Sequence, residues 1–288
     1  MSARVHAADD RLMLPGHQPL RWRTPAVALL GGALLLGLVG PWIAPHDPLA
    51  IPADVAQHSL GPSAMHWLGT DALGRDIASR LLAGARYSIG VASAALCLAT
   101  VLGVVVGSLA ASLGRAGERA VLSLVHSGAA VPRLVVLIAA AGFAGASSPW
   151  VLVALLGGVS WFDLARLVHR TLRRQLAEDR VAAARALGVT RTRLLRVHLL
   201  PHLTGTLLVW ASAEFGQLLL AETGLSFLGL GVPAPLPSWG RVLLETGDVF
   251  GSARWLLLGP GLLITVVVSA AFSVADRVAE EDQALPRL

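Results

Sequence analysis

Two charged side chains lie within long apolar stretches of the sequence, where an ionised group needs a special purpose. Arg133 lies within the apolar run 120–145, and Glu214 lies within the run 202–221. Helical rise from the nearest polar ends puts both near the middle of a membrane, where an unpaired charge costs roughly 2.5–3.5 kcal/mol. We therefore expect Arg133 and Glu214 to line a polar pathway or to pair with each other. Snorkelling of Arg133 and pairing within a second subunit are the alternatives.

Residue patterns typical of enzymes are absent from the sequence. All 23 basic residues are Arg, so the chain lacks the phosphate-binding Lys of a Walker A loop. It contains neither a Gly-x-Ser-x-Gly turn nor a His-Glu-x-x-His pair. His126 and Ser127 come nearest to a base and a nucleophile, but adjacent helix positions point in different directions. We therefore expect that the chain is not an enzyme and holds no cofactor.

Histidine and cysteine give no metal-binding pattern. Five histidines precede the second apolar run, at irregular spacing on polar segments: His6, His17, His46, His58 and His66. We interpret them as solvated residues and predict no metal site. The single cysteine, Cys97, lies in an apolar run, so an intrachain disulfide is excluded.

The composition is that of a membrane protein. Of the 288 residues 55% are hydrophobic and only 14% are charged, and the mean hydropathy is +0.66. A helix needs about 20 apolar residues to cross the roughly 30 Å hydrocarbon core. The sequence offers six such runs, at residues 25–44, 87–113, 120–145, 149–168, 202–221 and 255–275. We therefore predict an all-α polytopic membrane protein with six transmembrane helices.

These runs divide the chain into five parts. We expect a cytoplasmic tail (1–24), a first transmembrane anchor (25–44), an extracytoplasmic loop (45–86), a core with five transmembrane helices (87–276) and a cytoplasmic tail (277–288). A cleaved signal peptide is the alternative for the first run, which lacks a clean cleavage site. Asp71 or Asp76 can cap the helix that leads into the second run. Gly103 and Gly107, four residues apart, favour close packing of that run against a neighbour.

The arginines indicate an orientation. With the N-terminus inside, 17 Arg residues fall on the cytoplasmic side and 5 on the other, as the positive-inside rule requires. A pI near 11 could also suggest nucleic-acid binding. Because the charge is confined to short segments between apolar runs, we prefer the topological interpretation. It places residues 178–201 in the cytoplasm.

Residues 178–201 are an Arg-rich segment with a break in the middle. Good helix formers run from Val181 to Leu187, and Gly188 is the residue type that ends a helix in a left-handed cap. Thr190 can cap a second short helix, which Pro201 closes. We call this predicted helix-turn-helix the elbow. An amphipathic loop that binds anionic lipid is the alternative.

Three sequence blocks resemble those of binding-protein-dependent ABC importer permeases, in the dipeptide, oligopeptide and nickel branch. Residues 68–76 resemble its signature Leu-Gly-Thr-Asp-x-x-Gly-Arg-Asp, and residues 222–240 resemble its block Glu-x-x-Leu-Ser-Phe-Leu-Gly-Leu-Gly … Trp-Gly. The elbow resembles its coupling motif, Glu-Ala-Ala, three residues, Gly, nine residues, Ile-x-Leu-Pro. Here Ala182 stands where the family usually carries Glu.

The resemblance implies a type I ABC importer permease fold in which the elbow is a cytoplasmic coupling helix. The residues that it assigns to ATPase coupling are Ala182, Ala183, Ala184, Leu187, Gly188, His198, Leu200 and Pro201. The implied partners are a second homologous permease subunit, cytoplasmic ATPase subunits that bind the ATP, an extracytoplasmic solute-binding protein and membrane lipid, with no nucleic acid. The implied location is the bacterial cytoplasmic membrane, with the N-terminus inside. The implied cargo is a di- or oligopeptide, with nickel or a metal chelate as the alternative.

Overall fold

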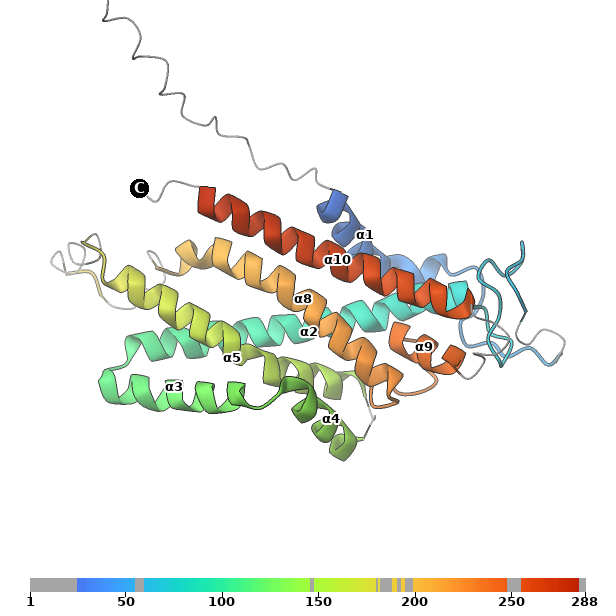
Figure 1. Ribbon diagram of the computed structural model, residues 1–288, viewed down its shortest axis with the longest axis horizontal. Coiled ribbons are helices and arrows are strands. Elements are labelled where there is room, and N and C mark those ends of the chain that lie inside the picture. The colour runs from blue at the N-terminus through green and yellow to red at the C-terminus, as the bar shows by residue number, and fades with distance from the viewer. Residues whose placement is uncertain are drawn as a thin grey trace, which may run out of the picture.

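The protein is a bundle of long helices (Figure 1). The structure, a computed structural model, describes residues 25–54, 60–145, 148–179, 181, 188–190, 193–194, 199–247 and 255–284. The helices are α1 (Pro25–Ile43), α2 (Ile77–Ser112), α3 (Arg115–Ala130), α4 (Arg133–Ala144), α5 (Pro149–Leu176), the 3₁₀ turn η3 (Leu200–Leu203), α8 (Thr204–Phe227), α9 (Trp239–Gly247) and α10 (Trp255–Ala284). The described residues include no β-strand, only one isolated bridge between Thr70 and Asp76. The all-α prediction is confirmed.

Helix α2 is the spine of the bundle. Its 36 residues span about 54 Å, so the helix that leads into the second apolar run and the run itself are one element. Asp76 is its N-cap and accepts a hydrogen bond from the Ser79 N–H. Gly103 and Gly107 face α5 so closely that an added Cβ would lie 2.7 Å from Leu164 Cβ and 2.6 Å from the Ala165 oxygen. The predicted close packing at these glycines is therefore confirmed.

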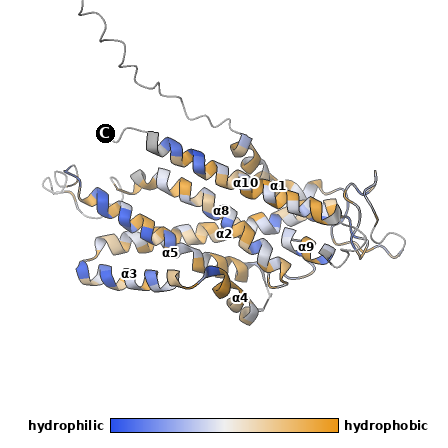
Figure 2. Ribbon diagram, viewed as in Figure 1, coloured by the Kyte–Doolittle hydropathy of each residue, from blue (hydrophilic) through white to orange (hydrophobic). Residues whose placement is uncertain are grey.

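Four of the described helices are long and apolar enough to cross a membrane: α1, α2, α5 and residues 257–281 of α10. Helix α8 has 24 residues, about 36 Å, and packs among them. Hydrophilic residues gather towards the helix ends and apolar ones between them (Figure 2). The chain is therefore multi-pass, although the described helices do not establish the predicted number of six spans.

The run 120–145 does not form the straight span that we expected. It is broken after Ala130, and α3 and α4 meet at 82°. Pro132 explains the break, because proline lacks an N–H and disfavours helical backbone in the residue before it. Val131 is accordingly extended, with φ −85° and ψ 132°. Arg133 is thus the first residue of a new helix rather than a point within a continuous one.

The two ends of the bundle differ, and Figure 1 shows them at opposite sides. At one end, which we call the loop end, lie the described residues of the segment 44–76 and helix α9. At the other, the elbow end, lie the start of α3, the end of α5, the start of α8 and the described residues of the elbow. Helices α8 and α10 extend beyond the predicted spans, to Phe227 and Ala284.

Candidate functional site

At the elbow end, the described residues of the elbow pack against the helices that flank it. Gly188 has a φ of +82°, the left-handed backbone expected of a helix-ending glycine. Leu200 and Pro201 lie in the turn η3 that leads into α8. The other predicted coupling residues, Ala182, Ala183, Ala184, Leu187 and His198, lie outside the described residues.

An apolar cluster fixes this end. Val181, Leu194, Leu199 and Leu203 are buried together with residues of α2 and α5, which are Ala111, Leu164, Val168 and Leu172. Because Leu172 and Leu203 are fully buried, the elbow is anchored on the ends of the two helices that it joins. A compact element held in this way can transmit a push from the elbow into α5 and α8.

A polar cluster that the sequence analysis missed lies beside it. Glu118, in the first turn of α3, has its Oε1 2.8 Å from His169 Nε2 and 3.4 Å from Arg173 Nε. His169 and Arg173 are four residues apart on α5, so they share one face of that helix. The cluster ties α3 to α5, 51 positions apart for Glu118 and His169, a distance in sequence that no local pattern reveals.

Arg133 and Glu214 form an ion pair between α4 and α8. Arg133 Nη1 donates to Glu214 Oε1 at 2.6 Å. The Glu214 side chain is 5% exposed and the Arg133 side chain 24%, so one charge is buried and the other reaches the surface beside it. Of the two expectations, pairing is what the structure shows. A role of the pair in lining a pore stays a prediction.

At the loop end, residues 68–76 fold into a compact turn around Asp71. Gly69 and Gly74 have φ values of +78° and +77°, which only glycine adopts readily. Asp71 accepts hydrogen bonds from the backbone N–H groups of Leu73 and Arg75, and the Arg75 side chain donates to it at 2.8 Å. The turn therefore holds the Arg75 side chain in a fixed position through Asp71.

Arg75 reaches helix α9, where three arginines converge on one carboxylate. Arg75 Nη2 donates to Glu245 Oε2 at 2.6 Å, Arg80 donates to the same oxygen, and Arg241 donates to Oε1 at 3.1 Å. Arg80 is 1% exposed, so its charge depends on Glu245 and Asp71 for compensation. Sequence reasoning missed Glu245, because its partners Arg75 and Arg80 are 170 and 165 positions away.

Trp239, in the block 222–240, joins that block to α2 through its backbone and its ring. Its N–H donates to Ser88 Oγ at 3.0 Å, and its indole N–H donates to the Leu81 carbonyl at 3.0 Å. A Cβ on the following residue, Gly240, would lie 2.1 Å from the Thr223 oxygen, so only glycine fits there. The blocks 68–76 and 222–240, far apart in sequence, therefore form one structural unit with the start of α2.

Glu222 is a buried carboxylate of this unit. It is fully buried on α8, and its Oε1 accepts a hydrogen bond from Ser226 Oγ at 2.7 Å. The Ser226 hydroxyl in turn accepts the Val232 N–H at 3.1 Å, which pins the chain after α8. The second block thus ends α8 at Phe227 and continues as a hydrogen-bonded turn rather than a further span, as its Gly and Pro content predicts.

Two of the five histidines contradict our interpretation that they are solvated. His66 is 14% exposed, and its Nδ1 lies 2.9 Å from Asp76 Oδ1. His46 Nδ1 lies 3.7 Å from Asp76 Oδ2, and the ring centroids of the two histidines are 4.9 Å apart. Tertiary folding brings together residues that sequence spacing keeps apart. His6, His17 and His58 lie outside the described residues.

Asp76 is held in its ionised form. Burial alone would raise its pKa, but hydrogen bonds from the Ser79 hydroxyl, the Ser79 N–H and His66, together with the nearby His46, outweigh burial and lower the pKa below its usual value. His46, His66 and Asp76 are the residues that could hold a metal ion in the part of the chain that the structure describes.

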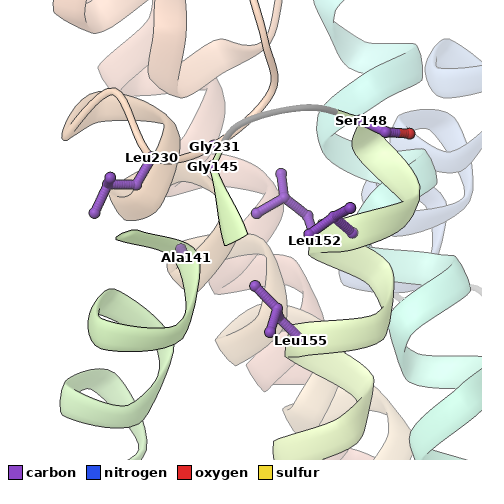
Figure 3. A pocket seen from close by; sticks show the side chains of 8 residues that line it. Ala141, Gly145, Ser148, Leu152, Leu155, Leu230 and Gly231 are labelled. Atoms are coloured by element: carbon purple, nitrogen blue, oxygen red, sulfur yellow. The ribbon is translucent and has the colours of Figure 1, made fainter. Parts of the chain in front are cut away.

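A small apolar hollow lies between the end of α4, the start of α5 and the chain after α8 (Figure 3). About 170 Å³ of space between atoms lies in this hollow, part of it open to solvent, and its lining includes Ala141, Leu152, Leu155 and Leu230. The hydroxyl of Ser148 points away from the other labelled side chains. Because the hollow offers no charged group and little room, it does not have the character of a peptide site.

The arrangement matches that of solved transporters. A chain of the methionine ABC transporter MetNI, in an inward-facing conformation, superposes with a TM-score of 0.58 at 18% identity, over 69% of this chain and 94% of that one. The protein therefore has the fold of a type I ABC importer permease, as predicted.

Sequence comparison gives the family. Residues 103–280 match the model of the binding-protein-dependent transport system inner membrane component, and the chain belongs to this family. The nickel transport system permease protein NikC of Escherichia coli is 33% identical over 89% of this chain and 92% of its own length. The di/tripeptide transport system permease protein DppC of Pseudomonas aeruginosa is 32% identical over 94% and 93%.

Membership of this family makes the chain a membrane channel component and not an enzyme. The family is one of inner membrane components, in keeping with the multi-pass helices, and it implies ATPase subunits, a substrate-binding protein and a permease partner.

Proposed function

We propose that this chain is the permease subunit through which an ABC importer moves di- or oligopeptides across the cytoplasmic membrane. The observation that carries the proposal is the match to the di/tripeptide permease of P. aeruginosa, which extends over nearly the whole of both chains. The complex consists of this chain, a second homologous permease, cytoplasmic ATPase subunits and an extracytoplasmic binding protein. ATP is bound on the ATPase subunits and not on this chain.

In this proposal the elbow receives the ATPase and the loop end faces outward. The N-terminus is then cytoplasmic, as the distribution of Arg favours. Ala182, Ala183, Ala184 and Leu187 contact the ATPase, while the buried leucines of the elbow carry the movement into α5 and α8. The ion pair Arg133–Glu214 lies on the pathway, at the break between α3 and α4, where irregular backbone is tolerated only beside protein or water.

Nickel import is the second candidate function, and the match to NikC favours it. The two candidates are separated by uptake. Cells that carry the partner subunits, with and without this chain, are given labelled di- and tripeptides or radioactive nickel. We expect the chain to be required for peptide uptake. If its removal abolished nickel uptake alone, the imported substrate would be nickel. A chain with no effect on either would overturn both.

A further inference from the structure

Three segments that are separate in sequence bring metal-ligating atoms together at the loop end. His46 follows the end of α1, His66 belongs to the loop, and Asp76 caps α2. One ligating atom from each of the three lies within 4.8 Å of the others. The group is distinct from the arginines that converge on Glu245. The partners of Asp76 are His66, His46 and Ser79.

Hydrogen bonds from Ser79 hold this group in position. Ser79 donates to Asp76 Oδ2 with its N–H at 2.8 Å and its hydroxyl at 2.6 Å, which fixes the carboxylate and leaves Oδ1 towards His66. The same Ser79 hydroxyl accepts the backbone N–H of His46 at 3.0 Å, which fixes the other histidine. His46 Nδ1 is buried and has no hydrogen-bond partner, so it is open to a ligand, whereas a bound ion would replace the hydrogen bond between His66 Nδ1 and Asp76 Oδ1.

Two imidazoles and a carboxylate are a ligand set for late first-row divalent metals. Ligand distances near 2.0–2.2 Å allow two ligand atoms to be at most about 4.4 Å apart across the ion. The observed spread of up to 4.8 Å therefore closes with side-chain shifts of less than about 1 Å. The hydrogen bonds of Ser79 to the carboxylate are the kind of outer contact that orients a metal ligand.

We propose that His46, His66 and Asp76 bind one divalent transition-metal ion of the class of Ni²⁺, Co²⁺ and Zn²⁺. The ion ties the end of α1 and the loop to the start of α2. It is a resident ion, and the proposal holds for either cargo of the transporter. Binding is therefore measured directly, without transport.

The test uses the full-length chain copurified with its partner subunits in detergent, with an affinity tag that contains no histidine. Co²⁺ is titrated in, its absorption bands report the ligand field, and Zn²⁺ and Ni²⁺ are added to displace it. We expect one Co²⁺ per chain. His46→Gln or His66→Gln should weaken binding by at least about 10-fold, since even outer contacts are worth 10–100-fold.

Two further variants make the result decisive. Asp76→Asn keeps an oxygen that can cap α2 but removes the anionic ligand, so it should weaken Co²⁺ binding while the chain still folds. His126→Gln removes an exposed histidine on α3 and should bind Co²⁺ as the wild type does. Absence of stoichiometric Co²⁺, or binding that His46→Gln and His66→Gln leave unchanged, would overturn the site and mark any bound metal as adventitious. Peptide uptake, measured separately, tests the proposed function whatever the outcome here.

Discussion

The loop end and the elbow end of this bundle are held by different forces. At the loop end, Arg75, Arg80 and Arg241 share Glu245, and Trp239 donates two hydrogen bonds to α2. At the elbow end, the described residues of the elbow are held by buried leucines and by one left-handed glycine. Hydrogen bonds and ion pairs have fixed directions, whereas apolar contacts are non-directional and allow neighbouring surfaces to slide.

The contrast indicates where such a transporter can move. A bundle whose loop end is cross-linked by directional bonds, and whose elbow rests on apolar contacts, opens and closes most easily at the elbow end. Glu118 and His169 are the exception, since they fix α3 to α5 by a polar contact at that end. We infer that α3 moves together with α5.

The largest effect on stability is expected from Glu245→Gln, which should destabilise the loop end and so reduce the difference between the two ends. The variant leaves Arg75 and Arg80 with Asp71 as their remaining carboxylate and removes the carboxylate that pairs with Arg241, and Arg80 is buried. Breaking a buried ion pair by removing one partner costs about 3–5 kcal/mol. We expect a lower unfolding temperature of the purified complex and increased proteolysis of the loop segment.

The matched control is Asp47→Asn in the loop segment, an exposed residue whose side-chain oxygen accepts the Leu49 N–H at 2.9 Å. Asparagine keeps an oxygen that can accept this hydrogen bond, and exposed substitutions of this kind usually change stability by less than about 0.5 kcal/mol, so the unfolding temperature should stay close to that of the wild type. Equal shifts in the two variants would show that the arginine cluster does not hold the loop end.

The second prediction concerns Arg133 and Glu214, which lie between the two ends. Either Arg133→Glu or Glu214→Arg leaves like charges within a membrane span, at a cost of roughly 2.5–3.5 kcal/mol per unpaired charge. Both single variants should lower the amount of folded chain and transport. The double swap should restore the amount of folded chain, because it rebuilds the pair with its ends exchanged.

A neutral pair, Arg133→Met with Glu214→Gln, sharpens this result. If the charges serve folding alone, the neutral pair folds and transports; if they also guide the cargo, it folds without transporting. Additive defects in the charge swap would show that the two residues act independently, against the contact between them in the structure.

Much of this fold could be predicted from the sequence, because apolar length, glycine spacing and N-caps act locally. Apolar runs located the long helices, and Gly103 and Gly107 identified the face of α2 that packs on α5. The break at Pro132 could have been expected from proline chemistry, but the apolar run around it outweighed that signal. The continuation of α10 to Ala284 has no apolar signature, because most of residues 276–284 are charged or polar.

The site was less predictable, because its contacts join distant segments. Arg133 and Glu214 were found as charges within apolar runs, which is a signal of composition. Glu245 and the cluster of His46, His66 and Asp76 carry no such signal, since only the folded chain brings their partners near. Asp76 was recognised as a helix cap, yet nothing in its spacing indicated that two imidazoles would lie beside it.

The third prediction concerns Gly188 in the elbow. Here we expect the smallest effect on stability but a specific effect on function. A Cβ there meets no neighbouring atom, so space is not the constraint, and only the φ of +82° requires glycine. Gly188→Val forces a β-branched residue into left-handed backbone at a cost of about 1–3 kcal/mol. We expect the variant to insert and assemble normally but to lose most ATP-driven uptake, as its elbow no longer holds the bend.

Gly188→Asn is the matched control, because asparagine tolerates this backbone and should retain uptake. Full uptake by the Val variant would show that the bend at Gly188 is not needed for coupling. Equal loss in both variants would assign the effect to the side chain itself and not to the backbone angle that distinguishes the elbow from the hydrogen-bonded loop end.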